Sequence, residues 1–398
     1  MKHNIISLWI IILIASAFLG GCSGQNESMT QGMAVSSEAA SAATPTGELI
    51  KRDSGGQDSI KIGAILMLTG IGASQGIASL RSAKMAIEEI NKAGGLLGKP
   101  VELVVEDNQG DNPATAVSAL QSLMARGISI VLGPNWSPSG NAVAPVACDN
   151  KVMMISPSLG IADFNEKCDY IFNLWPHDDA LSRLLSRKVY DLGFRRIAVL
   201  GSEQMWEKIQ SEAVKQGFED AGGQVVSYQI APQGDRDFRT LALKIKSSQP
   251  DAVVLTAFTF EDSAGKDLRT QGVDVPFFSV LVDDDRLRAA QGVLEDTKVI
   301  TSFTPSPKFS DAYAKKYGEK LDMSGDTSYD TIQLIASAIK ATGSTDPTIL
   351  KTYLGTIKEY DGVSGHMVFD GKGGVSKQPQ MMVVKGTSLV PLQDAIKK

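Results

Sequence analysis

Two loops rich in hydroxyl groups contain side chains that could bind a small ligand. Ser137 follows the apolar run 128–132, and Ser158 follows the run 152–156. Loops of small residues let backbone N–H groups approach a carboxylate, and the N-terminus of a following helix adds partial positive charge. The pattern therefore indicates carboxylate binding. The alternative is a pair of ordinary turns in which Gly, Ser and Pro serve turn geometry alone.

These loops require a strand–helix–strand unit to hold them. Two short apolar strands joined by a helix are expected to be parallel and adjacent in one sheet. Their carboxyl ends then place both loops at the edge where α/β proteins bind ligands.

The remainder of the chain repeats this alternation, so we predict an α/β fold of two successive units, each with a parallel sheet. The first sheet is predicted from strands at 60–67, 101–105, 128–132, 152–156 and 170–174, and the second from strands at 196–200, 224–230, 252–256, 276–280 and 299–303. Helices are expected at 308–321, 327–342 and 346–357, before a β-rich tail.

The change from strands to helices near residue 303 predicts that the chain returns to its first lobe before it ends. The predicted lobes are 59–177 plus 304–363 and 178–303 plus 364–398. More than one crossover between two lobes makes a hinge with a cleft.

Composition and motifs argue against several functions. The chain has 398 residues, 43% hydrophobic and 21% charged, as in soluble globular proteins, and its net charge of −6 gives no support to nucleic acid as a partner. The glycines 70, 72 and 76 do not have dinucleotide-fingerprint spacing. His177 and His366 belong to no catalytic pattern, so we expect no enzyme activity, no cofactor and no metal site.

The N-terminus has the features of an export signal. The apolar run 5–19 is shorter than the roughly 20 residues that span a bilayer. The sequence Leu19-Gly-Gly-Cys22 resembles the lipobox of bacterial lipoproteins, which implies cleavage before Cys22 and lipid attachment to it. We expect a signal peptide at 1–21, a flexible tether at 22–58 and a lipid-anchored protein of the bacterial cell envelope, facing the periplasm or the exterior. A plain secretory signal or membrane anchor is the alternative.

Two further cysteines, Cys148 and Cys168, would lie in an oxidising compartment if the chain is exported. They form either a disulfide or two free buried thiols, and the sequence leaves both open.

A series of short motifs resembles one protein family over residues 60 to 390. The motifs include Leu68-Thr-Gly70, Ala86-Ile-Glu-Glu-Ile-Asn91, Val101-Glu-Leu-Val-Val-Glu-Asp107, Ser156-Pro157-Ser158 and Tyr329-Asp330. They are similar to type I periplasmic solute-binding proteins of the branched-chain amino acid (Leu/Ile/Val) ABC transporters. The resemblance implies an α/β fold of two Rossmann-like lobes, a three-segment hinge and one small polar ligand enclosed on closure.

The resemblance also implies which residues contact the ligand. In the first lobe they are Gln75, Trp136, Ser137 and the loop Ser158, Leu159 and Gly160, where the family usually has Thr at position 160. In the second lobe and on the return helix they are Trp206, Phe258, Tyr329 and Asp283, the last as partner of a ligand ammonium group. Leu281 could occupy that position instead, and the ligand then need not be an amino acid.

The expected function is capture of a small carboxylate-bearing solute, a branched-chain or other neutral amino acid, for an ABC transporter permease. The protein is expected to act as a monomer. The alternative is a ligand-sensing receptor of the same fold that binds an aromatic acid or amide.

Overall fold

The computed structural model describes residues 58–392. The predicted signal peptide, the lipidation site Cys22 and the tether before residue 58 lie outside this range. Within residues 58–392, no helix has the length and apolar character needed to cross a membrane.

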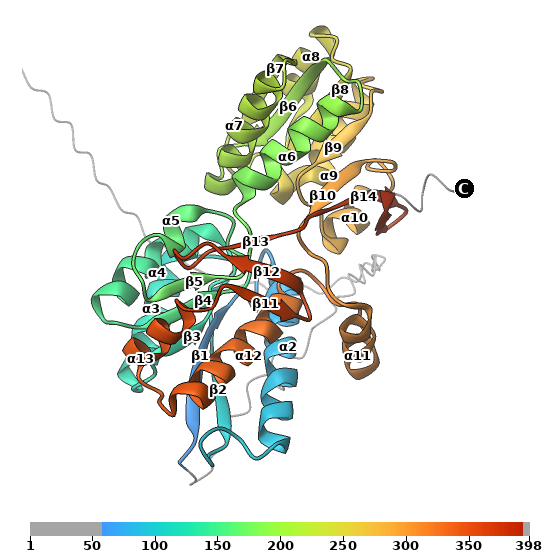
Figure 1. The fold of residues 1–398 in the computed structure, drawn as a ribbon. Coiled ribbons are helices and arrows are strands. Elements are labelled where there is room, and N and C mark those ends of the chain that lie inside the picture. Colours follow the sequence, from blue (N-terminus) through green and yellow to red (C-terminus); the bar gives the residue numbers. More distant parts are fainter. Residues whose placement is uncertain (1–57, 393–398) are drawn as a thin grey trace, which may run out of the picture. The chain divides into compact units, whose positions relative to one another are not determined.

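The first sheet has five parallel strands in the order β2-β1-β3-β4-β5 (Figure 1). They are β1 (Ile60–Leu66), β2 (Val101–Asp107), β3 (Ile130–Leu132), β4 (Met153–Ser156) and β5 (Ile171–Asn173). The strands β1, β3, β4 and β5 are almost wholly buried, which explains their continuous apolar runs. The predicted parallel pairing of the two strands at the opening loops, β3 and β4, is confirmed.

Helices cover both faces of the first sheet. Those between its strands are α2 (Ala73–Lys92), α3 (Pro113–Ala125), α4 (Ser137–Asp149) and the short α5 (Ala162–Asn165). Two helices of the return segment, α12 (Gly325–Thr342) and α13 (Pro347–Leu354), also pack on it, and α12 lies along α2. Local sequence sets the helix starts: Asn112 accepts a hydrogen bond from Thr115 N ahead of Pro113, and Asp346 caps α13 in the same way.

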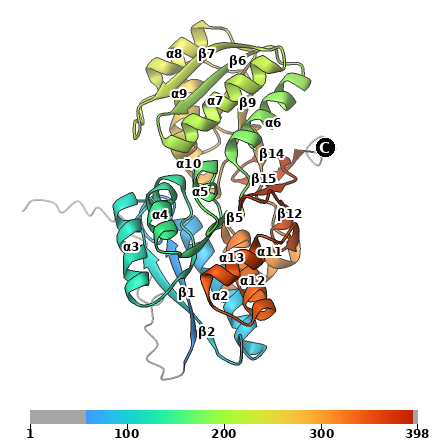
Figure 2. The ribbon, with the colours of Figure 1, turned by 60° about the vertical axis from the view of Figure 1, so that its left-hand side comes forward.

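The second sheet has seven strands in the order β15-β14-β10-β9-β8-β6-β7. Its parallel part consists of β6 (Arg196–Ser202), β7 (Gln224–Ala231), β8 (Ala252–Thr256), β9 (Phe277–Ser279) and β10 (Lys298–Thr301). The helices α6 (Asp178–Asp191) and α7 (Met205–Asp220) pack together on one face (Figure 2). The helices α8 (Arg239–Ser247), α9 (Glu261–Thr270) and α10 (Asp284–Ala290) follow the later strands.

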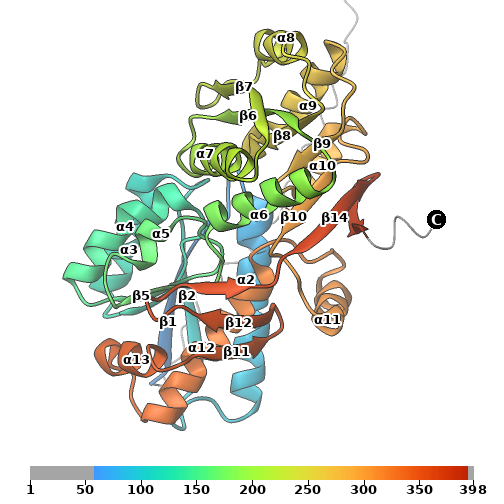
Figure 3. The same ribbon diagram turned by 45° about the horizontal axis from the view of Figure 1, so that its top comes forward.

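The C-terminal strands divide between two sheets. The antiparallel strands β14 (Gln380–Lys385) and β15 (Ser388–Pro391) extend the second sheet from β10 (Figure 3). The strands β11 (Glu359–Gly362), β12 (Gly365–Phe369) and β13 (Val375–Lys377) form a small separate sheet. The predicted lobe boundary at residue 364 therefore falls inside a hydrogen-bonded hairpin, because β12 pairs with β11.

The chain passes between the two large sheets three times: after β5, after β10 and after β13. The second passage leads into α11 (Pro307–Tyr317). The third follows the small sheet, which is tied to the first sheet by a 2.7 Å hydrogen bond from Asn173 N to Gly373 O. These passages agree with the three-segment connection that the sequence implied.

Cys148, near the end of α4, and Cys168, before β5, form a disulfide with their Cα atoms 6.0 Å apart. Of the two alternatives that the sequence left open, the bridge is present.

Candidate ligand-binding site

A cavity lined mostly by buried residues lies where the order of strands reverses in both large sheets. In the first sheet this point is between β1 and β3, and in the second it is between β6 and β8. Loops diverge from the carboxyl ends of strands at such a point, which is where open α/β sheets bind ligands. The lining residues come from the loops after β1, β3, β4, β5, β6, β8 and β9 and from the start of α12: Gln75, Trp136, Ser137, Ser158, Gly160, Trp175, Asp178, Trp206, Phe258, Leu281 and Met323.

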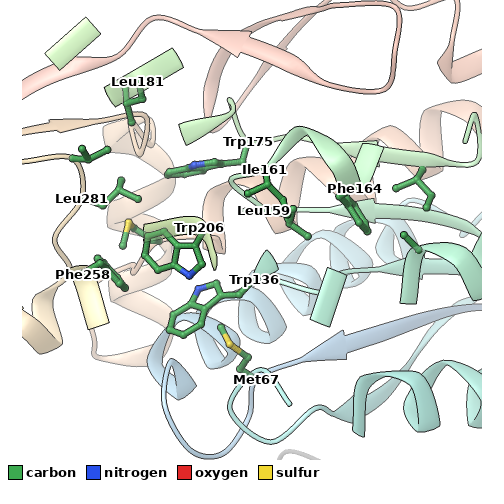
Figure 4. Packing of buried hydrophobic residues seen from close by; sticks show 14 of the residues in the cluster. Met67, Trp136, Leu159, Ile161, Phe164, Trp175, Leu181, Trp206, Phe258 and Leu281 are labelled. Carbon is green, nitrogen blue, oxygen red and sulfur yellow. The ribbon is translucent and has the colours of Figure 1, made fainter. Parts of the chain in front are cut away.

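Aromatic rings from both sheets form much of the wall. The ring centroids of Trp136 and Trp206 are 6.3 Å apart, and those of Trp206 and Phe258 are 5.3 Å apart in an edge-on arrangement. Figure 4 shows the two indoles and Phe258 grouped together, with Trp175 and Leu281 close by. Such rings offer a large apolar surface with few conformations to lose on binding.

The cavity is small in this conformation, at about 30 Å³. That volume has room for about one water molecule, whereas ligand sites are usually several hundred Å³. Entry of a solute therefore requires the rings to rotate or the two sheets to move apart.

Gln75 connects the loops of the two sheets at this cavity. Its Oε1 accepts a hydrogen bond from Trp136 Nε1 at 3.0 Å, and its Nε2 donates to Asp283 Oδ2 at 3.2 Å. Gln75 is 2% exposed, so the pair of bonds is shielded from water. The amide thereby fixes the Trp136 indole against the second sheet.

Asp283 does not line the cavity, contrary to the prediction that it faces a ligand ammonium group. Its Oδ1 caps α10 by accepting from Arg286 N at 2.8 Å, and its Oδ2 accepts from Arg286 Nη1 at 2.6 Å. Helix capping and an ion pair therefore occupy this carboxylate. Leu281, the alternative for this position, lines the cavity.

Ser137 is the first residue of α4 and is 1% exposed. Trp136 occupies the N-cap position without a side-chain cap bond, so Ser137 does not act as the cap. Within residues 58–392 the Ser137 hydroxyl has no hydrogen-bond partner. The first sheet thus presents a free hydroxyl at a helix N-terminus, a favourable place for a carboxylate.

The neighbouring hydroxyl, Ser158, is already engaged. It donates to Asn135 O at 3.0 Å and accepts from Ser324 Oγ at 2.7 Å. Leu159 is fully buried in the hydrophobic core and does not line the cavity, which corrects its place among the predicted contacts. Only the outer members of the loop, Ser158 and Gly160, reach the cavity.

Gly160 leaves room for a carboxylate from another element. A Cβ atom on Gly160 would lie 1.9 Å from Asp178 Oδ2. Asp178, the first residue of α6, accepts hydrogen bonds from Trp175 Nε1 and Gln210 Nε2, each at 3.1 Å. Burial raises the pKa of Asp178 to about 6. The Asp178 carboxylate thus occupies the space that a Thr side chain at position 160 would fill.

Trp206, on the first turn of α7, is 5% exposed, and its Nε1 has no hydrogen-bond partner among residues 58–392. In Figure 4 the nitrogen-bearing edge of Trp206 faces Trp136. A buried donor without an acceptor costs free energy, which a ligand oxygen could recover. Trp206 is therefore a second donor available to a ligand.

Buried Glu207 holds the loops that carry Trp206 and Phe258. Its Oε1 accepts from Thr259 N at 2.8 Å, and its Oε2 accepts from the Ser202 hydroxyl. Burial raises the pKa of Glu207. These bonds tie the ends of β6 and β8 together, and so fix the spacing of the two rings.

Tyr329 lies away from the cavity, so its predicted ligand contact is not supported. Its hydroxyl donates to Glu89 Oε2 at 2.5 Å, and its ring packs on Phe309 with centroids 4.8 Å apart. Met323, just before α12, lines the cavity instead.

Sequence reasoning also missed Trp175 and Asp178. Their signal was the run Leu174-Trp-Pro-His-Asp-Asp179 directly after a strand of the first sheet. Among residues 58–392 there is no group of three or more His, Cys, Asp or Glu side chains suited to a metal ion.

Comparison with known proteins places this geometry in one family. The profile of the family described as "Periplasmic binding protein" matches residues 59–388, and the chain belongs to that family. It is accordingly a binding protein and not an enzyme.

Two individual proteins resemble the chain over most of its length. The chain is 28% identical to the Leu/Ile/Val-binding protein BraC3 of Rhizobium johnstonii over 80% of this chain and 89% of that protein. It is 26% identical to the crystal structure of LivJ, a branched-chain amino acid transporter substrate-binding protein from Streptococcus pneumoniae in complex with isoleucine, with a TM-score of 0.76 over 83% and 97% of the two chains.

A third relative shares the fold but binds a different type of ligand. A solute-binding protein of an ABC transporter from R. palustris, in complex with benzoate, has a TM-score of 0.75 over 84% of this chain and 95% of that protein. At 18% identity this likeness concerns the fold alone.

Proposed function

We propose that this chain is the substrate-binding lipoprotein of an ABC importer, and that it captures a small carboxylate-bearing solute in the cavity between its two large sheets. The solute is a branched-chain or other neutral amino acid. The observation that carries the proposal is the pair of buried, unpartnered donors, the Ser137 hydroxyl and Trp206 Nε1, contributed from opposite sides of one cavity.

Each donor would bind a ligand oxygen when the solute enters. A carboxylate accepts from the Ser137 hydroxyl at the N-terminus of α4, where the helix dipole favours negative charge. The Trp206 indole supplies a bond from the second sheet. The apolar part of the solute packs on the aromatic rings and Leu281.

Closure would follow from the ligand binding the closed form more tightly than the open form. The donors lie on loops of different sheets, so both can reach one ligand only when those loops are close. We expect the lobes predicted from the sequence to rotate about the three connecting segments, with the small sheet β11–β13 moving with the first sheet.

The lipid anchor belongs to the same proposal. Cys22 would be modified after cleavage of residues 1–21, and the segment up to residue 58 would tether the binding unit to the envelope beside its permease. The variant Cys22→Ser is expected to give protein that stays in the aqueous phase on detergent partitioning. Recovery of this variant in the detergent phase would contradict lipidation at Cys22.

The binding site is tested by isothermal titration with L-leucine, L-isoleucine and L-valine. The variant Ser137→Ala should weaken binding by about 1–2 kcal/mol, because a buried hydrogen bond to a charged group is lost. Ser118→Ala on the exposed face of α3 is a matched control that should bind normally. Equal affinities of the two variants would remove Ser137 from the site.

An aromatic acid or amide, sensed or transported by the same fold, is the second candidate. The observation in its favour is the aromatic wall formed by Trp136, Trp175, Trp206 and Phe258. A planar ring could pack between such side chains as well as an aliphatic one.

A further inference from the structure

One charged side chain, Asp178, lines the cavity within the part of the chain that the structure describes. It is 3% exposed, and the side chains that donate to it, Trp175 and Gln210, are both neutral. The adjacent acid, Asp179, adds repulsion to the cost of burial. Asp178 is thus a buried anion without a cation, an arrangement that proteins normally avoid.

Two other buried acids, Asp283 and Glu207, already have partners. Asp283 is paired with Arg286, and Glu207 accepts hydrogen bonds from Ser202 and Thr259. Neither of these acids lines the cavity. Of the described residues that line the cavity, Asp178 is the one acid, so a positive group that entered would find this carboxylate at the start of α6.

The chain makes specific room for this carboxylate. Because a Cβ on residue 160 would nearly coincide with Asp178 Oδ2, any residue other than glycine there would displace the acid. The backbone reinforces the approach, since Asp178 N donates to Gly160 O at 2.8 Å. Because residue 160 has no side chain, the Asp178 carboxylate can lie against the loop 158–160.

We propose that Asp178 binds a positively charged nitrogen of the solute, so that the site selects a zwitterion, such as a neutral amino acid, over acids that lack nitrogen. This inference rests on the proposed function. Leu281 of the second sheet lines the cavity where an acid was expected, so the ligand ammonium group needs another partner, and Asp178 supplies it. The two ends of the site then match the two ends of the solute: Ser137 and Trp206 donate to its carboxylate, and Asp178 accepts from its ammonium.

Physical considerations favour this pairing. An ammonium group beside Asp178 would neutralise the buried charge and form charge-assisted hydrogen bonds in a water-poor cavity. The faces of the Trp175 and Trp206 rings, which line the same cavity, attract cations and repel anions. A benzoate-like acid would gain the ring contacts but leave Asp178 unpaired.

The test compares amino acids with counterparts that differ only by the missing amino group. Calorimetric titration of the purified protein with L-leucine and 4-methylpentanoate, and with L-phenylalanine and 3-phenylpropanoate, gives two such pairs. We expect at least one amino acid to bind tenfold or more tightly than its counterpart. In Asp178→Asn that ratio should fall below about threefold. Asn can keep the bond from Trp175, and Gln210 can turn its amide to match.

Asp179→Asn is the control, because it removes the same charge from a neighbouring, less buried residue and should keep the tenfold preference. If Asp178→Asn fails to fold, the ratio in the unaltered protein still decides. Equal or tighter binding of the nitrogen-free acids overturns the inference but leaves the proposed function standing, provided that Ser137→Ala weakens their binding. Binding of none of the four solutes overturns both.

Discussion

Gln75 Nε2 donates a 3.2 Å hydrogen bond to Asp283 Oδ2, and so joins the start of α2 on the first sheet to the start of α10 on the second. Both residues are at most 3% exposed. Because Asp283 is also paired with Arg286, the bond from Gln75 is to a charged acceptor that is already held in place. In the proposed mechanism this hydrogen bond would stabilise the closed arrangement of the two sheets.

The variant Gln75→Ala should therefore shift the ligand-free protein towards a more open form. A hydrogen bond to a charged group contributes about 1.5–3 kcal/mol, so the change in population should be large enough to measure. Small-angle scattering should give a larger radius of gyration, and calorimetry a weaker ligand affinity. An unchanged radius together with an unchanged affinity would show that this bond has no part in closure.

Replacing the free indole donor should weaken ligand binding while leaving stability almost unchanged. Trp206→Phe removes an unpartnered buried N–H, which costs about 1–3 kcal/mol in the ligand-free protein, although the smaller ring leaves a cavity that offsets part of this gain. Chemical denaturation should show little or no loss of stability, while calorimetry shows ligand binding weaker by about 1–2 kcal/mol. Equal losses of unfolding free energy and of binding free energy would mean that Trp206 serves packing alone.

Ligand binding should weaken in acid because of Asp178. Burial raises the pKa of this carboxyl to about 6, so in the free protein it is protonated below that pH and cannot attract an ammonium group. We expect affinity for L-leucine, or for whichever amino acid binds, to fall up to tenfold for each pH unit below about 6. The same variant, Asp178→Asn, should flatten this part of the profile. If Asp179→Asn flattened the dependence of affinity on pH and Asp178→Asn left it unchanged, Asp178 would not be the group that binds the ammonium.

The pKa of Asp178 also has a consequence for stability. Since the carboxyl is ordinarily ionised above pH 4 in the unfolded chain, the folded state holds one more proton between about pH 4 and pH 6. Asp178 therefore favours the folded state on the acid side, and this contribution is lost as pH rises through about 6. Comparing urea unfolding of the unaltered protein and Asp178→Asn over this range isolates the effect from other buried acids.

The disulfide between Cys148 and Cys168 should matter for stability and not for binding. It closes a segment with a sequence separation of 20, for which the chain-entropy model gives about 3 kcal/mol. Neither cysteine lines the cavity. The double variant Cys148→Ala/Cys168→Ala should unfold at lower urea concentration with unaltered ligand affinity. Reduction should raise the intact mass of the unaltered protein by the mass of two hydrogen atoms. A mass unaffected by reduction would rule out the bridge.

The sheets were predictable from sequence because each parallel strand is a buried apolar run that ends in a loop of small residues. Ser137, Trp206 and Phe258 could be assigned to the loops that line the cavity because each lies a few residues after the carboxyl end of such a strand. Their positions depend on strand ends alone, which the apolar pattern defines well.

The residues that were misplaced depend on finer geometry. Asp283 and Leu281 differ by two positions in one loop, and the N-cap requirement of α10 turns the acid away from the cavity. Tyr329 fails for a related reason, since the rotation of α12 directs it to Glu89 and Phe309 and leaves Met323 at the cavity. Asp178 could not be distinguished from Asp179 without knowing which of the two carboxylates fills the space above Gly160.

Tryptophan fluorescence tests the central claim most directly. Three of the four tryptophans, Trp136, Trp175 and Trp206, line the cavity, and the fourth, Trp9, lies in the predicted signal peptide. Titration of the mature protein with an amino acid that binds by calorimetry should give a saturable change in emission with the same dissociation constant, weakened in Ser137→Ala. A solute that binds by calorimetry yet leaves the emission unchanged would show that it is held somewhere other than between these two sheets.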